Sequence, residues 1–131
     1  MTDPLKIVIV EDDALIAMDL AELLMGMGHD VCSIACTEAQ AVAAGLRCKP
    51  DLMIVDGALA EGSGIAAMAQ ILEHFCVPHL YVTGDPHHPL ELVPGAVVLG
   101  RPFTVQDLAV GMARALLGPG STSPNHARQI A

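Results

Sequence analysis

A short apolar run, Leu52–Val55, ends in Asp56 and Gly57. The run is too short for a typical helix and carries β-branched residues, so it predicts a buried strand with Asp56 at its carboxyl end. In open α/β sheets ligands bind outside the carboxyl ends of the strands, because loops from several strands meet there. Asp56 is therefore either a loop cap or part of a site.

The rest of the chain alternates apolar runs with segments of helical periodicity. Strands are predicted over 5–10, 30–36, 52–56, 77–82 and 96–99, and helices over 14–27, 37–48, 64–75 and 104–117. Strands alternating with helices through short loops imply right-handed crossovers. The predicted fold is α/β and doubly wound, with a five-stranded parallel sheet in the flavodoxin-like order 2-1-3-4-5.

Two segments interrupt this alternation. Prolines at 86, 89 and 94 stand between the fourth and fifth strands. A proline inside a helix costs roughly 3 kcal/mol, so we expect the fourth helix to be short, near 90–93, or disordered. Residues 118–131 lack periodicity and are expected to form a disordered tail after a domain spanning 1–117. We therefore expect no separate output domain beyond Leu117.

The composition argues against some classes of function. The 131 residues suit one domain, 53% of them are apolar and 2% aromatic, and the net charge is −9 from 15 acids and 6 bases. Lys and Arg form no cluster, which disfavours a nucleic-acid partner. The sequence carries no signal-peptide pattern and no membrane-length apolar run, so a cytoplasmic protein without membrane contact is expected.

The cysteines and histidines form no recognisable metal motif. The four cysteines are Cys32, Cys36, Cys48 and Cys76, without a CxxC pair. Buried reduced thiols are the favoured interpretation, and a disulfide or a zinc role is the alternative. The adjacent pair His87 and His88 lies in a proline-flanked loop and is not favoured as a metal site.

The predicted strand order brings polar residues to one edge of the sheet. Glu11, Asp12 and Asp56 would converge there, joined by Thr83 and Arg101 from the fourth and fifth strand ends. Gathered carboxylates repel one another unless a hard cation such as Mg²⁺ neutralises them. Acids, a cation, a hydroxyl and one fixed positive charge suit a phosphoryl group, with Asp56 as the nucleophile that forms an aspartyl phosphate.

Each of these residues also has a simpler interpretation. Asp12 or Asp13 at a strand-to-helix junction is often only a helix N-cap. Thr83 alone would be a loop hydroxyl, and Arg101 alone a solvated base. Five such residues at the ends of four strands make coincidence the weaker explanation.

The set Glu11-Asp12, Asp56, Thr83 and Arg101-Pro102-Phe103 resembles the receiver domain of bacterial two-component response regulators, which has the CheY-like fold. The resemblance covers about residues 5–117 and points to an atypical single-domain subgroup. It implies that Asp56 is the phosphoacceptor and Thr83 the switch hydroxyl. It further implies a Mg²⁺ site of Asp12 directly, Glu11 through water, Asp56 and the Ala58 carbonyl.

The chain departs from the family pattern at two switch positions. Arg101 stands where the family has a lysine, and a planar guanidinium grips two oxygens where an ammonium is a point charge. Val98 replaces the usual aromatic residue, so the usual coupling of a threonine shift to a ring flip cannot operate. Tyr81 is interpreted as a packed strand aromatic, with a substitute switching role as the alternative.

The resemblance implies a non-enzymatic signalling module. A sensor histidine kinase or a histidine phosphotransfer protein would donate the phosphoryl group, and output would pass by protein contact or phosphate shuttling from a monomer or weak dimer. Phosphorylation would shift the loop over 84–95 between mobile and ordered states. Two alternatives remain open: a phosphorylation-independent interaction module, and a magnesium phosphohydrolase, which Ala58 argues against because such enzymes often have an acid there.

Overall fold

The computed structural model describes residues 3–84, 92 and 95–117. Along the described chain, strands and helices alternate up to the fourth strand, and the fifth strand and the last helix follow it. They are β1 (Lys6–Val10), α1 (Ala14–Gly26), β2 (Asp30–Ala35), α2 (Glu38–Cys48), β3 (Leu52–Asp56), α3 (Gly64–Leu72), β4 (His79–Thr83), β5 (Val98–Gly100) and α4 (Val105–Leu117). The predicted short fourth helix, the pair His87 and His88, most of the 84–95 loop and the tail from 118 lie outside the described residues.

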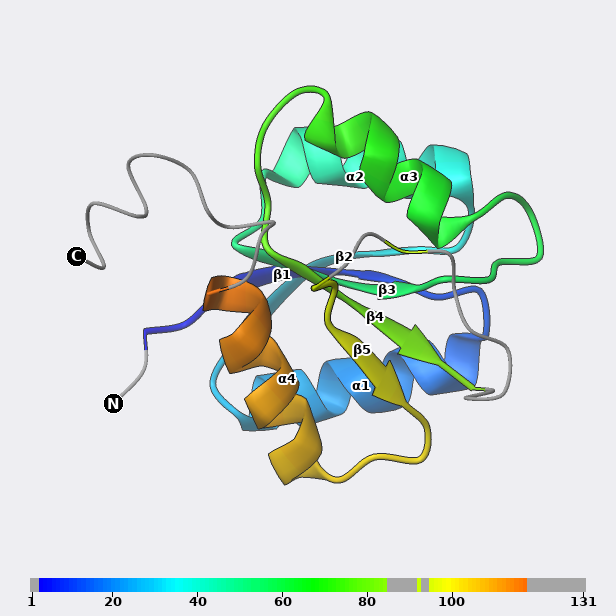
Figure 1. Ribbon diagram of the computed structural model, residues 1–131. Helices are drawn as coiled ribbons and strands as arrows, with labels where there is room; N and C mark the ends of the chain where they lie inside the picture. Colours follow the sequence, from blue (N-terminus) through cyan, green and yellow to red (C-terminus); the bar gives the residue numbers. More distant parts are fainter. Residues whose placement is uncertain (1–2, 85–91, 93–94, 118–131) are drawn as a thin grey trace.

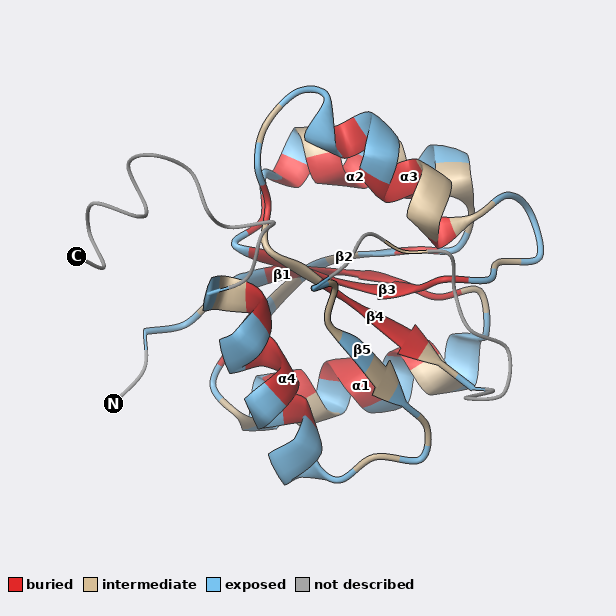
Figure 2. Ribbon diagram, in the orientation of Figure 1, coloured by how far each residue is buried: buried red, intermediate tan, exposed pale blue. Residues whose placement is uncertain are grey.

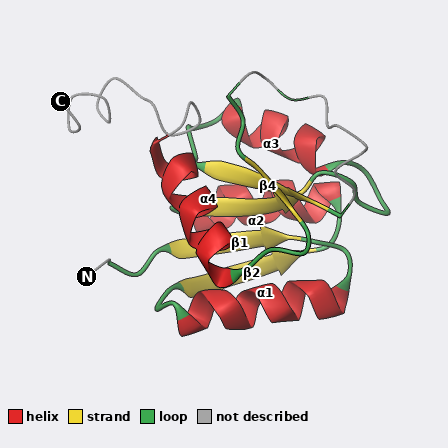
Figure 3. Cartoon of the chain, turned by 60° about the horizontal axis from the view of Figure 1, so that its bottom comes forward, coloured by secondary structure: helices red, strands yellow, loops and turns green. Residues whose placement is uncertain are grey.

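The strands form one parallel sheet in the order β2-β1-β3-β4-β5, which confirms the predicted topology. Helices α2 and α3 cover one face, and α1 and α4 cover the other (Figure 1). The view turned by 60° shows the same layers (Figure 3). The carboxyl ends of all five strands therefore lie at one edge, where the loops to the helices begin.

Aliphatic side chains on both faces of the sheet make up the core. In β1, Ile7 and Ile9 pack toward α1 and α4, while Val8 and Val10 pack toward α2 and α3. The central strands are buried along most of their length (Figure 2). A strand covered on both faces needs apolar residues at every position, which explains the continuous apolar runs of the sequence.

Side-chain caps set the starts of the four described helices, and at α4 the side chains of Thr104 and Asp107 each accept from the backbone N–H of the other. Asp13 accepts from the N–H groups of Leu15 and Ile16 at the start of α1, so Asp13 rather than Asp12 is the cap. Thr37 caps α2 and Ser63 caps α3.

Three predicted boundaries were wrong by a few residues. Helix α3 ends at Leu72 rather than 75, because the chain turns as His74 and Phe75 donate to the Ile71 carbonyl. Strand β4 begins at His79 rather than 77, since Pro78 has no N–H and joins the ladder only as an acceptor for Met53. Strand β5 covers Val98–Gly100 rather than 96–99.

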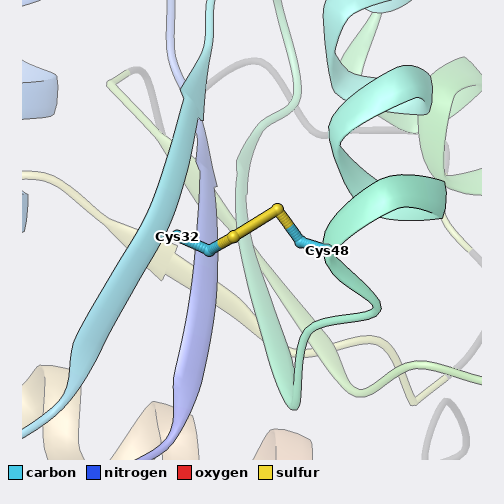
Figure 4. Close-up of a disulfide and its surroundings, with 2 residues drawn as sticks. All are labelled: Cys32 and Cys48. Carbon is cyan, nitrogen blue, oxygen red and sulfur yellow. A yellow bond between two sulfur atoms is a disulfide. The ribbon is translucent and has the colours of Figure 1, made fainter.

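The expectation of four reduced, buried thiols was wrong. Cys32 in β2 and Cys48 at the end of α2 form a disulfide (Figure 4), with their Cα atoms 6.6 Å apart. The register between β1 and β2 shifts between Ile7 and Val8, so Cys32 has no partner in β1. Such an irregularity re-aims a side chain and is not visible in cysteine spacing. Cys36 and Cys76 are free and exposed.

In the part of the chain that the structure describes, no helix has the length and apolarity needed to span a bilayer.

Replacing Cys48 with Ser should lower the free energy of unfolding by about 3 kcal/mol, because the disulfide closes a loop between residues 16 apart and restricts the unfolded chain. Urea denaturation without reductant measures the change, and Cys76→Ser is the matched control. The denatured wild type should expose two thiols before reduction and four after it. Four thiols without reductant would contradict the disulfide.

Candidate functional site

Three carboxylates meet at the carboxyl edge of the sheet. Glu11 and Asp12 follow β1, and Asp56 ends β3, the neighbouring strand in which Val55 is paired with Val10. One carboxylate oxygen from each lies within 4.8 Å of the others. Glu11 and Asp56 are buried, at 4% and 8% exposure. The strand order therefore brings these acids together, as the sequence predicts.

A backbone N–H group holds each carboxylate in place. Asp13 donates to Glu11 Oε2 at 3.0 Å, and Ala58 donates to Asp56 Oδ1 at 3.0 Å. Ala60 donates to Asp12 Oδ2 at 2.6 Å. Hydrogen bonds to charged acceptors are short and strong, so these bonds orient the three acids before any ligand arrives.

Arg101 supplies the positive charge of the site. Its N–H continues the β4–β5 ladder by donating to the Thr83 carbonyl at 2.8 Å, which places the side chain over the strand ends. Nη1 donates to Glu11 Oε1 at 2.9 Å, while Nη2 lies 4.0 Å from Asp56 Oδ2. The guanidinium therefore binds Glu11 directly and stands next to Asp56.

Gly84 leaves room for this arginine. A Cβ atom at position 84 would lie 2.8 Å from Arg101 Nη2, closer than atoms of neighbouring side chains normally approach. The sequence predicted neither this contact nor the pairing of Arg101 with Glu11. The glycine directly after the β4 strand end was the available signal.

Burial and a neighbouring charge raise the pKa of Glu11 from 4.5 to about 7. Desolvation is the largest cause, and the negative charge of Asp56 adds to it. The bonds from the Asp13 N–H and from Arg101 act in the opposite direction and lower the pKa. Neutralising one acid thus partly relieves the repulsion within the cluster.

Thr83 and Ala58 lie at the same edge. Thr83 is the last residue of β4 and is half-exposed, one position beyond Val82, which is paired with Asp56. Ala58 is in the loop that follows Asp56, where it forms an antiparallel bridge with Ser63.

A largely apolar cavity of about 430 Å³ adjoins the acidic cluster. Its wall includes Asp56, Arg101, the loop residues Pro102 and Phe103, and one side of α1. On α1, outside the residues that line this cavity, Leu15 and Met18 are 73% and 60% exposed. The cluster of acids therefore borders an apolar cavity.

No protein-family model matches the chain. It is 36% identical over 115 residues to the phyllosphere-induced regulator PhyR of Methylorubrum extorquens, covering 85% of this chain and 43% of that protein. It is 34% identical over 109 residues to the transcriptional regulatory protein PdtaR of Mycobacterium tuberculosis, covering 80% of this chain and 53% of that protein. The chain spans about half the length of these curated relatives.

One solved structure consists of a single domain that can be compared with this chain over nearly its whole length. The solution structure of the REC domain of the PhyR response regulator of Erythrobacter litoralis has a TM-score of 0.74 and 29% identity, covering 92% of this chain and 97% of that domain. This chain is a response-regulator receiver domain. The resemblance seen in the sequence is thereby confirmed, and a receiver domain is a signalling module rather than an enzyme.

Position 98, where the family usually has an aromatic residue, is a valine in this receiver domain. Val98 is 46% exposed and is paired with Tyr81 of β4. Tyr81 is only 4% exposed within the core facing α2 and α3, and burial raises its pKa to about 12. Tyr81 is therefore the packed strand aromatic that the sequence favoured.

In metal-free buffer the receiver domain should lose stability as the pH rises from 4.5 to 7. Over that range the folded state keeps a proton on Glu11 that the unfolded state has released, so folding becomes less favourable by about 3 kcal/mol in total. Urea denaturation at several pH values measures this slope. Glu11→Gln should flatten it, and an equal slope in both proteins would contradict the raised pKa of Glu11.

Proposed function

We propose that this receiver domain accepts a phosphoryl group on Asp56 from the phosphohistidine of a sensor histidine kinase or phosphotransfer protein, in a Mg²⁺-dependent reaction. The observation that carries the proposal is the cluster of Glu11, Asp12 and Asp56 within 4.8 Å, with the Arg101 guanidinium beside Asp56. A phosphoryl group needs both positive charge around its oxygens and a nearby nucleophile.

The donor set suits Mg²⁺. This ion prefers oxygen ligands and is typically bound through one or two carboxylates together with phosphate oxygens and water. Asp12 and Asp56 would bind it directly, Glu11 through water, and the Ala58 carbonyl would add a ligand. When bound, Mg²⁺ would neutralise the acids and the charge on the transferred group.

The hydrogen bonds suggest which oxygen of Asp56 reacts. Oδ1 accepts the Ala58 N–H, whereas Oδ2 lies on the side of Arg101. Oδ2 would attack phosphorus as the bond to the histidine nitrogen of the donor breaks, and a proton on the other ring nitrogen of the donor would make the leaving group a neutral imidazole beside the aspartyl phosphate. Arg101 would bind the phosphoryl oxygens, and the Thr83 hydroxyl would donate to one of them.

The apolar surface beside the site suits the donor protein. The cavity next to Asp56 would take apolar side chains from a partner helix. Docking there would bring a phosphohistidine to Asp56 while water is excluded. Output would then follow by altered contact with a target protein or by onward phosphate transfer.

A phosphorylation-independent interaction domain is the second candidate. The observations that favour it are the direct bond from Arg101 to Glu11 rather than to Asp56, and the exposed Val98 in place of a switch aromatic. In that case the ion pair would hold the site closed to phosphate.

Incubation with acetyl phosphate and Mg²⁺ should add the mass of one phosphoryl group, because Asp56 can act on a small donor. Intact-mass spectrometry measures the addition. Asp56→Asn should abolish it, since the nucleophilic oxygen is lost, while Asp19→Asn is the matched control on the wall of the cavity. An unlabelled wild type under these conditions would favour the phosphorylation-independent candidate.

Replacing Thr83 with Ala should leave labelling of Asp56 intact and weaken the response to it. The hydroxyl would bind the phosphoryl group after transfer and would not attack phosphorus. The measurement is the change in backbone amide shifts on adding beryllofluoride with Mg²⁺, compared with Thr104→Ala, which lies outside the acidic cluster. Equal shift changes in the wild type and Thr83→Ala would count against the switching role.

A further inference from the structure

The loop between β3 and α3, residues 57–63, connects the acidic cluster to α2. At the cluster, Ala58 donates to Asp56 Oδ1 and Ala60 donates to Asp12 Oδ2. At its other end the loop meets Glu38, the first residue of α2. The positions of Ala58 and Ala60 therefore depend on what holds this far end.

Glu38 bonds to the loop and to α3 through both its carboxylate oxygens and its backbone. Oε1 accepts the Ser63 N–H at 3.0 Å, and Oε2 accepts from Gln70 Nε2 at 2.9 Å. The Glu38 N–H donates to the Glu61 carbonyl at 3.1 Å. One residue thus joins the start of α2 to the end of the loop and to α3.

Gly62 brings the loop against this carboxylate. Its φ of +89° is a conformation that favours glycine. A Cβ at position 62 would lie 2.5 Å from the Cβ of Glu38 and 2.7 Å from Oε1. Only a residue without a side chain allows this approach, so the loop conformation and the Glu38 contact require each other.

We infer that Glu38 is a positioning residue for the acidic cluster: by holding Ser63 and Gln70 it keeps the loop in the shape in which Asp12 and Asp56 can share a cation. This inference rests on the proposed Mg²⁺ site. The antiparallel bridge between Ala58 and Ser63 transmits the restraint, because it couples the Glu38-bound end of the loop to the residue that binds Asp56. Glu38 itself contacts no ligand.

The test compares Glu38→Ala with two controls. Glu38→Gln keeps an acceptor for the Ser63 N–H, and its amide can donate to Gln70 once the Gln70 amide turns over. Like Glu38→Ala, Glu61→Ala removes one negative charge, here from the loop, but it leaves the backbone bond between Glu61 and Glu38 in place. Gln70→Ala removes one bond only and serves if Glu38→Ala does not fold.

Two measurements read the effect. Without metal, hydrogen exchange of the Ala58 and Ala60 amides should accelerate about tenfold in Glu38→Ala. The Mg²⁺ dissociation constant from amide-shift titration should rise about tenfold, as for other residues that orient metal ligands. Gln70→Ala should change both quantities in the same direction by less. Glu38→Gln and Glu61→Ala should stay near the wild type.

Unchanged exchange and Mg²⁺ affinity in Glu38→Ala would overturn the inference, and so would an equal loss of affinity in Glu61→Ala, which would assign the effect to charge alone. The exchange measurement separates this inference from the proposed function, because it uses no phosphoryl donor and no metal. A wild type that binds Mg²⁺ but takes no phosphoryl group would refute phosphotransfer and leave the role of Glu38 standing.

Discussion

The ion pair between Arg101 and Glu11 is the interaction on which the site depends. It joins the chain directly after β1 to the chain directly after β5, although the two residues are 90 positions apart. Without a positive charge there, Glu11 and Asp56 would be two buried carboxylates in repulsion. The pair therefore lets a cluster of acids exist at a sheet edge, although burial and the charge of Asp56 still raise the pKa of Glu11.

The same ion pair shapes what the receiver domain can do. Arg101 reaches Glu11 in preference to Asp56, so a phosphoryl group on Asp56 would offer the guanidinium a second anionic partner. A planar guanidinium can hold two oxygens at once, which an ammonium group does less well. The guanidinium of Arg101 thus links the strand that ends in Asp56 to the end of β1 through one side chain.

Contacts at both ends of α2 join this helix to the sheet. At its start, Glu38 holds the loop after β3, and at its end, Cys48 is linked to Cys32 of β2. The helix packs against the sheet through small residues such as Ala41 and Ala44. The position of α2 therefore affects both the loop that orients Asp12 and Asp56 and the edge strand β2.

Local patterns in the sequence were enough to predict the alternation of elements, the strand order and the meeting of Glu11, Asp12 and Asp56. The physical reason is that apolar periodicity reports burial, and a parallel sheet must bring the carboxyl ends of its strands to one edge. Only the tertiary structure decided the partner of Arg101, the disulfide of Cys32 with Cys48, and the contact of Glu38 with the loop. Those contacts join residues far apart in the chain, and they depend on strand register and on side-chain direction, which periodicity does not encode.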